Sequence, residues 1–142
     1  MIKHQLKVIK TALLRSHERT EPRRLKNLEK EIIRDTILKK PILVDEKTYL
    51  VIDGHHRLAV LSKLGIKKIP VILVNYFNPK IKVKSWDNRN GLNKNIIIKA
   101  GLAGKLLPPK TSKHMLLIAG KLIHVEILQK EVNAKLKELL KQ

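Results

Sequence analysis

The octapeptide Val51-Ile52-Asp53-Gly54-His55-His56-Arg57-Leu58 leads an apolar strand through a single glycine into a helix that begins with basic and polar side chains. Backbone N–H groups without helical partners, together with the helix dipole, make a helix N-terminus a site for anions. Gly54 lets an anion approach the backbone closely, and the planar guanidinium of Arg57 can pair with phosphate oxygens. His55 and His56 can donate or accept hydrogen bonds. The pattern predicts a phosphate-binding turn; the alternative is a turn in which the histidines only cap the helix.

The segments around this turn predict a mixed arrangement of strands and helices. Residues 41–45 and 49–53 are two apolar runs separated by three polar residues, which predicts a hairpin. A helix over 55–64 would end at Gly65. The continuous apolar run 71–74 is typical of a buried central strand.

Residues ahead of the hairpin predict a strand and a longer helix. The mostly apolar stretch 6–14 is compatible with an edge strand. Thr20 is the expected N-cap of the helix, and Pro22 suits its first turn, where a missing N–H does no harm. We expect this helix to end near Asp35, with one apolar face.

The C-terminal half also predicts a mixture of strands and helices. Residues 81–84 predict a half-exposed strand, 87–91 a loop, 93–103 a helix and 115–125 a hairpin. A last helix is expected over 126–141. Its apolar stripe would consist of Leu128, Val132, Leu136 and Leu139.

The motif Asp53-Gly54-His55-His56-Arg57 resembles the phosphate-binding motif of the ParB/sulfiredoxin superfamily, and this version is similar to that of archaeal free L-serine kinases. Other segments follow the same order in those kinases. They are His17-Glu18 ahead of an amphipathic helix, residues 69–77, residues 83–86 and Pro109-Lys110-Thr111-Ser112-Lys113-His114. The resemblance implies an α/β fold, a small mixed sheet flanked by helices, and phosphorylation of serine to O-phosphoserine with Mg²⁺ and ATP or ADP.

The resemblance also implies roles for single residues. Glu18 would be the general base that takes the serine hydroxyl proton; a surface acid is its alternative. Asp53 would hold the substrate hydroxyl or organise magnesium; a helix N-cap is its alternative. Trp86 and His56 would lie in the substrate pocket, although a lone tryptophan is often a core residue. Nucleotide phosphates would bind to Gly54, His55, His56, Arg57, Lys110, Thr111 and His114, unless the last three only form a solvated basic loop. Glu31 stands where the first helix of those kinases carries a serine that helps bind substrate.

Composition narrows the class of protein. The 142 residues fit a single domain over 1–142, and 43% hydrophobic content is enough for a core. The chain has no cysteine, which excludes a disulfide scaffold, a thiolate zinc site and a sulfiredoxin-like thiol mechanism. No apolar run approaches the ~20 residues of a membrane span, so we expect a cytoplasmic protein without membrane contact. No histidine spacing predicts a structural metal site.

A formal net charge of +19 leaves a second function open. It could attract nucleic acid, which makes a ParB-like nucleic-acid-binding protein or nuclease the alternative to a kinase. Lysines occur in every segment, however, as in a solvated basic surface. We therefore expect only non-specific nucleic-acid binding beside a small-molecule substrate and a nucleotide. The oligomeric state is left open.

Overall fold

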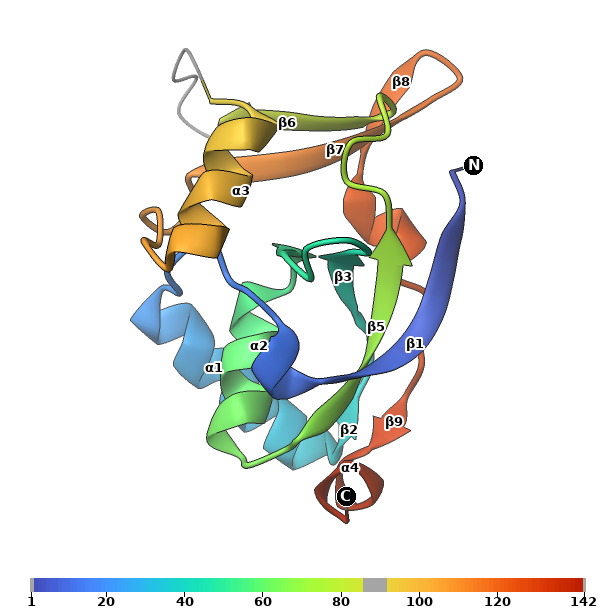
Figure 1. Cartoon of the computed structure of the whole chain (residues 1–142). Coiled ribbons are helices and arrows are strands. Elements are labelled where there is room, and N and C mark those ends of the chain that lie inside the picture. Colours follow the sequence, from blue (N-terminus) through green and yellow to red (C-terminus); the bar gives the residue numbers. More distant parts are fainter. Residues whose placement is uncertain (1, 86–91, 142) are drawn as a thin grey trace.

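A four-stranded mixed sheet carries the glycine turn. The computed structural model describes residues 2–85 and 92–141. The sheet has the order β1-β5-β3-β4, with β3 parallel to β5 and the other neighbours antiparallel. Its strands are β1 (His4–Lys10), β3 (Ile42–Asp45), β4 (Val51–Asp53) and β5 (Lys68–Val74). β4 is an edge strand and ends beside Gly54, so the turn lies at a border of the sheet (Figure 1).

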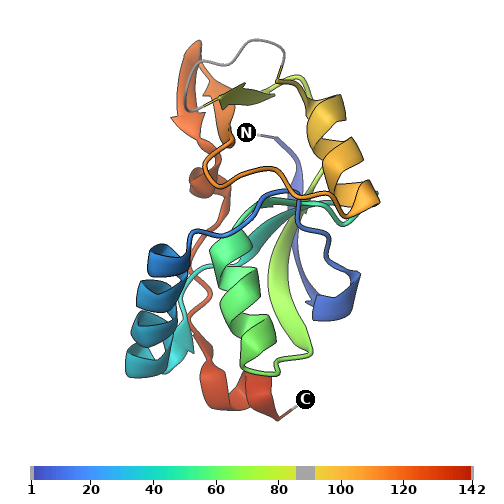
Figure 2. The same cartoon turned by 90° about the vertical axis from the view of Figure 1, so that its left-hand side faces the viewer.

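Two helices cover one face of this sheet. α1 (Pro22–Asp35) and α2 (His55–Lys63) lie side by side in Figures 1 and 2. One cluster of buried side chains joins them to the sheet, and it includes Ile32, Leu61 and Val71. Because this cluster holds α2 against the strands, the direction of its N-terminus is set by the core.

The opposite face packs against a smaller antiparallel sheet and a third helix. The sheet is β6-β7-β8, made of β6 (Ile81–Ser85), β7 (Ser112–Ile118) and β8 (Lys121–His124). α3 (Lys94–Ala103) and the 3₁₀ helix η2 (Val125–Leu128) complete a second buried cluster. None of the described helices is long and apolar enough to cross a membrane.

Most predicted elements are confirmed. The edge strand is β1, and it continues into the 3₁₀ helix η1 (Thr11–Leu13). The hairpin β3–β4, the helix before Gly65, the interior strand β5 and the hairpin β7–β8 are all present. The prediction that Thr20 caps the first helix is wrong. Glu21 is the N-cap, and its carboxylate accepts hydrogen bonds from the N–H groups of Arg23 and Arg24.

The predicted helix over 126–141 is also wrong. The segment forms η2, then a stretch without regular structure, then the two-residue strand β9 (Ala134–Lys135), which pairs with β2 (Ile37–Leu38), and the short helix α4 (Leu136–Leu140). The apolar stripe is divided, because Leu128 belongs to the second cluster and Leu139 to the first. The Val132 N–H donates to the carbonyl of Lys39, which gives this backbone group a partner outside any helix.

Candidate functional site

The N-terminus of α2 has the conformation that the sequence predicts. Gly54 caps the helix at φ 110°, a left-handed conformation that residues with a side chain rarely adopt. A Cβ at this position would lie 3.1 Å from the Ile42 side chain and 3.3 Å from Arg57 Nη2. Glycine is therefore required both for the turn and for the space next to it.

Both histidines of the motif accept a backbone N–H from the chain ahead of α1. His55 is buried, and its Nε2 lies 3.2 Å from the N atom of His17. His56 Nε2 lies 3.0 Å from the N atom of Glu21. Burial lowers the pKa of each imidazole, so both are neutral at pH 7 and carry their hydrogen on Nδ1. The histidines tie α2 to the start of α1 and do more than cap their own helix.

Arg57 and Asp53 form an ion pair across the turn. Arg57 Nη2 lies 3.2 Å from Asp53 Oδ2, and Arg57 Nη1 donates to the carbonyl of Pro41 at 2.8 Å. The side chains keep 18% and 30% of their surface exposed, respectively. Arg57 therefore holds the strand edge in place while it presents positive charge beside Gly54.

The backbone around Glu18 pairs, as in a sheet, with the loop at Leu107, which is distant in the sequence. The carbonyl of His17 and the N–H of Arg19 both pair with the backbone of Leu107 at 2.8 Å. The Glu18 carboxylate accepts the N–H of Lys110 at 3.2 Å and the N–H of Ser112 at 3.0 Å. Burial raises the pKa of Glu18, and these hydrogen bonds partly oppose that rise. The result is a carboxylate held in one direction, with raised proton affinity.

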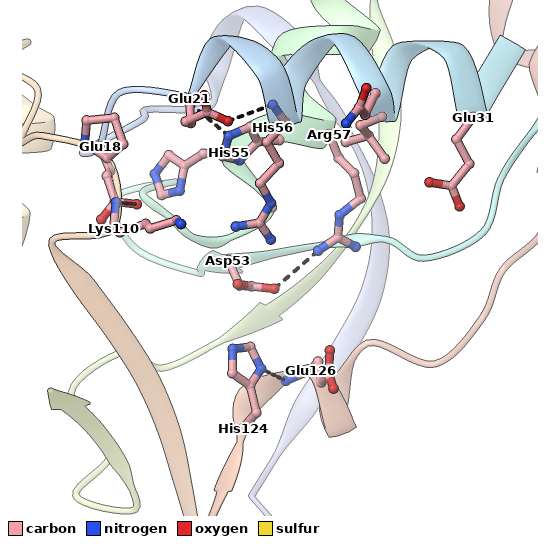
Figure 3. A pocket seen from close by; sticks show the side chains of 15 residues that line it. Glu18, Glu21, Glu31, Asp53, His55, His56, Arg57, Lys110, His124 and Glu126 are labelled. Atoms are coloured by element: carbon pink, nitrogen blue, oxygen red, sulfur yellow. Dashed lines mark hydrogen bonds and ion pairs between the residues drawn. The ribbon is translucent and has the colours of Figure 1, made fainter. Parts of the chain in front are cut away.

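These groups open onto one pocket of about 540 Å³ (Figure 3). Glu18 and Lys110 lie at one end and Glu31 at the other, with Asp53 between them. The volume is within the range of small-molecule sites. The lining consists of Glu18, Glu21, Arg24, Asn27, Leu28, Glu31, Asp53, Gly54, His55, His56, Arg57, Pro109, Lys110, His124 and Glu126.

Two predicted site residues within the described part of the chain are not brought to this lining. Thr111 is buried, and its hydroxyl donates to the carbonyl of Pro108. His114 is buried too, and its Nε2 lies 2.7 Å from the hydroxyl oxygen of Tyr76. Trp86 and the predicted loop 87–91 lie outside the described residues.

Sequence reasoning missed several residues of the lining. Arg24 and Asn27 share a face of α1 with Glu31, the position that the resemblance linked to substrate binding, and the spacings of three and four residues could have placed them there. His124 and Glu126 gave no comparable signal, because they come from the segment predicted as hairpin and last helix. His124 Nδ1 accepts the N–H of Glu126 at 3.1 Å.

Comparisons with known proteins agree with this architecture. Residues 2–87 match the ParB N-terminal domain. An ATP-dependent L-serine kinase from Staphylothermus marinus is 42% identical over 74 residues, which cover 49% of this chain and 29% of that protein. An ADP-dependent L-serine kinase from Thermococcus kodakarensis is 35% identical over 77 residues, 51% of this chain and 32% of that protein. The matched segments thus span about a third of the length of these relatives.

A solved structure resembles nearly the whole chain. A free serine kinase in complex with AMP has a TM-score of 0.77 and 17% sequence identity, and the match covers 94% of this chain and 93% of that one. At this identity the likeness establishes the fold.

Proposed function

The chain belongs to the ParB N-terminal domain family, and on this fold we propose that it is a kinase that transfers the terminal phosphoryl group of ATP or ADP to the hydroxyl of free L-serine. One observation carries the proposal. A fixed carboxylate of raised pKa, Glu18, and a glycine-capped helix N-terminus at Gly54 open onto the same small-molecule pocket. The identity to curated L-serine kinases supports the choice of substrate.

Each end of the pocket has a task in this reaction. Phosphoryl transfer requires mainly positioning and charge stabilisation, with one group to orient the attacking hydroxyl. The nucleotide phosphates would lie against Gly54, His55, His56 and Arg57, with Lys110 as an added cation. Glu18 would accept the proton of the serine hydroxyl as its oxygen attacks phosphorus. Thr111 and His114 would support the loop that carries Lys110 without touching the ligand.

Magnesium fits the oxygen donors of this pocket. Mg²⁺ prefers carboxylate and phosphate oxygens and is usually held by few protein groups together with the nucleotide. We propose that the ion enters with the nucleotide, where it offsets phosphate charge, and that Asp53 offers an oxygen to the ion or to the substrate hydroxyl. Trp86 would complete the substrate side, together with His56.

A direct assay tests the function. The protein is incubated with L-serine, Mg²⁺ and either ATP or ADP, and O-phosphoserine is measured by mass spectrometry. We expect product with at least one nucleotide, and formation that is slower by ~10²–10⁴-fold with Glu18→Gln. L-threonine and glycerol serve as competing acceptors. Absence of phosphoserine with both nucleotides, in a sample that binds nucleotide, would rule out the serine kinase.

A further inference from the structure

A chain of hydrogen bonds leads from Glu18 into the protein interior. The Ser112 hydroxyl oxygen lies 3.2 Å from Glu18 Oε1 and 3.1 Å from His17 Nε2. His17 is completely buried, and its Nδ1 lies 2.9 Å from the carbonyl oxygen of Val51. Neither His17 nor Ser112 lines the pocket, so neither is placed to touch a ligand there.

The hydrogens of this chain can be counted. A carbonyl oxygen only accepts, so Nδ1 of His17 must carry a hydrogen to bond with Val51. Burial lowers the pKa of His17 to about 4, so the ring is neutral at pH 7 and Nε2 is an acceptor. The Ser112 hydroxyl has one hydrogen and lies between two acceptors, His17 Nε2 and the ionised carboxylate of Glu18. The two acceptors therefore compete for that hydrogen, and when His17 Nε2 takes it, the Glu18 carboxylate keeps the N–H groups of Lys110 and Ser112 but loses the hydroxyl.

One added proton removes the conflict. When Glu18 is protonated, it is a weaker hydrogen-bond acceptor. The Ser112 hydroxyl can then donate its hydrogen to His17 Nε2. Every group in the chain then has a suitable partner. If the proton were instead on His17, the chain would also be complete, but the burial of that ring disfavours the charge.

We propose that His17 is a positioning residue that increases the proton affinity of Glu18, because its Nε2 draws the Ser112 hydroxyl hydrogen away from the ionised carboxylate. The inference rests on the proposed kinase function. In the transfer step, the acceptor hydroxyl proton moves to Glu18 and its oxygen forms a bond to phosphorus. The bond from phosphorus to the bridging oxygen breaks, and its electron pair leaves with the nucleotide. By holding the Ser112 hydroxyl hydrogen, His17 favours the protonated Glu18 that results.

The groups that face this chain do not compete with it for a proton at neutral pH. His55 accepts the N–H of His17, and burial lowers its pKa well below the usual value. The His114 ring lies 5.8 Å from that of His17, and burial lowers its pKa in the same way. Lys110 contributes its backbone N–H to Glu18. A proton that this chain takes up as the pH falls should therefore go to Glu18.

Two matched substitutions of His17 separate the contributions of its two ring nitrogens to the hydrogen-bond chain from Glu18 through Ser112 to His17, here called the relay. His17→Asn keeps a donor near Nδ1 for the Val51 carbonyl and removes the acceptor near Ser112. His17→Gln keeps a neutral acceptor near Nε2. The Glu18 pKa is measured by ¹³C NMR titration of the side-chain carboxyl in each protein, and kcat for serine phosphorylation is measured against pH. His17→Phe, which fills the ring volume without an acceptor, replaces His17→Asn if that variant does not fold.

We expect His17→Asn to lower the Glu18 pKa by roughly one unit, tenfold in proton affinity. Its kcat should fall, with the KM for nucleotide unchanged, while His17→Gln stays close to wild type. The same Glu18 pKa in wild type, His17→Asn and His17→Gln would overturn the relay. Equal changes of the pKa and kcat in His17→Asn and His17→Gln would overturn it too. A shifted Glu18 pKa in a protein that never forms phosphoserine would retain the relay and reject the kinase, so the two failures are distinguishable.

Discussion

The carboxylate of Glu18 is held by hydrogen bonds to Lys110 and Ser112 and is partly withdrawn from water. Because burial raises its pKa, Glu18 takes up a proton at higher pH than a free glutamate, and a protonated carboxyl is no base. We expect kcat to fall as pH decreases through this raised pKa and to level off above it. The measurement is kcat against pH for wild type and Glu18→Gln.

Glu18→Gln keeps the shape of the side chain and cannot take a proton. Loss of a general base costs ~10²–10⁴-fold in rate. Nucleotide affinity should be nearly unchanged, because the phosphates are expected at Gly54 to Arg57. An active Glu18→Gln enzyme, with the same pH profile, would assign the base to another group, and Asp53 would be tested next.

The predictability of the site from sequence differs from residue to residue. Gly54 to Arg57 are contiguous, so their chemistry can be predicted from a single turn. Arg24 and His124 reach the same pocket from separate elements, and no local pattern connects them. His114 has the residue type of a phosphate ligand, but its partner is Tyr76, and burial of that pair is a tertiary effect.

At the scale of elements, the junction between β4 and α2 depends on Gly54. We expect Gly54→Ala to lower the free energy of unfolding by ~1–3 kcal/mol, because a side chain is strained at φ 110°. The added methyl group would also fill the space beside Arg57. Nucleotide with magnesium should therefore raise the melting temperature of this variant much less than that of wild type.

Gly65→Ala is the matched control for that experiment. Gly65 follows α2 with φ 80°, but a Cβ there meets nothing within 4 Å. This variant should share the backbone strain and keep the full thermal shift by nucleotide. Equal shifts in Gly54→Ala and Gly65→Ala would remove the phosphate site from the N-terminus of α2.

A second prediction at this scale concerns the packing of α3 on the main sheet. A Cβ at Gly101 would overlap Leu50 Cδ1, and Leu50 is completely buried. We expect Gly101→Ala to destabilise the protein by ~1–3 kcal/mol in urea unfolding, since overpacking outweighs the better helix propensity of alanine. Leu50→Val should restore part of the loss in the double variant. Additive losses would show that Gly101 and Leu50 do not limit this contact.

The elements themselves were mostly predictable because their periodicity is local. The exception is the segment after His124, where four apolar residues match a helical stripe, but Leu128 packs in one cluster and Leu136 and Leu139 in the other. The N–H groups of Val132 and Asn133 donate to the carbonyl of Lys39 instead of to a helical partner. Such long-range partners leave no periodic signal in the sequence.

At the scale of the whole molecule, the effect of the +19 net charge on binding to nucleic acid depends on where the basic residues lie. Basic residues occur along the described chain from Lys3 to Lys141, and few of them have acidic partners in ion pairs. A positive surface of this kind releases counterions from any nucleic acid, whatever the sequence, and its affinity falls steeply with salt. The pocket, in contrast, combines acidic and basic groups and suits a small ligand.

We therefore expect weak binding to DNA without sequence preference, lost between roughly 50 and 200 mM salt. Fluorescence anisotropy with several unrelated duplexes would measure it, and the same titrations in the presence of saturating nucleotide serve as a control. A kinase with a generally basic surface should give the same affinity for every duplex and leave phosphorylation of serine unaffected by DNA. Tight binding to one sequence that survives about 200 mM salt would require base contacts, because phosphate contacts alone carry no sequence information. That result would favour the ParB-like nucleic-acid-binding function over the kinase.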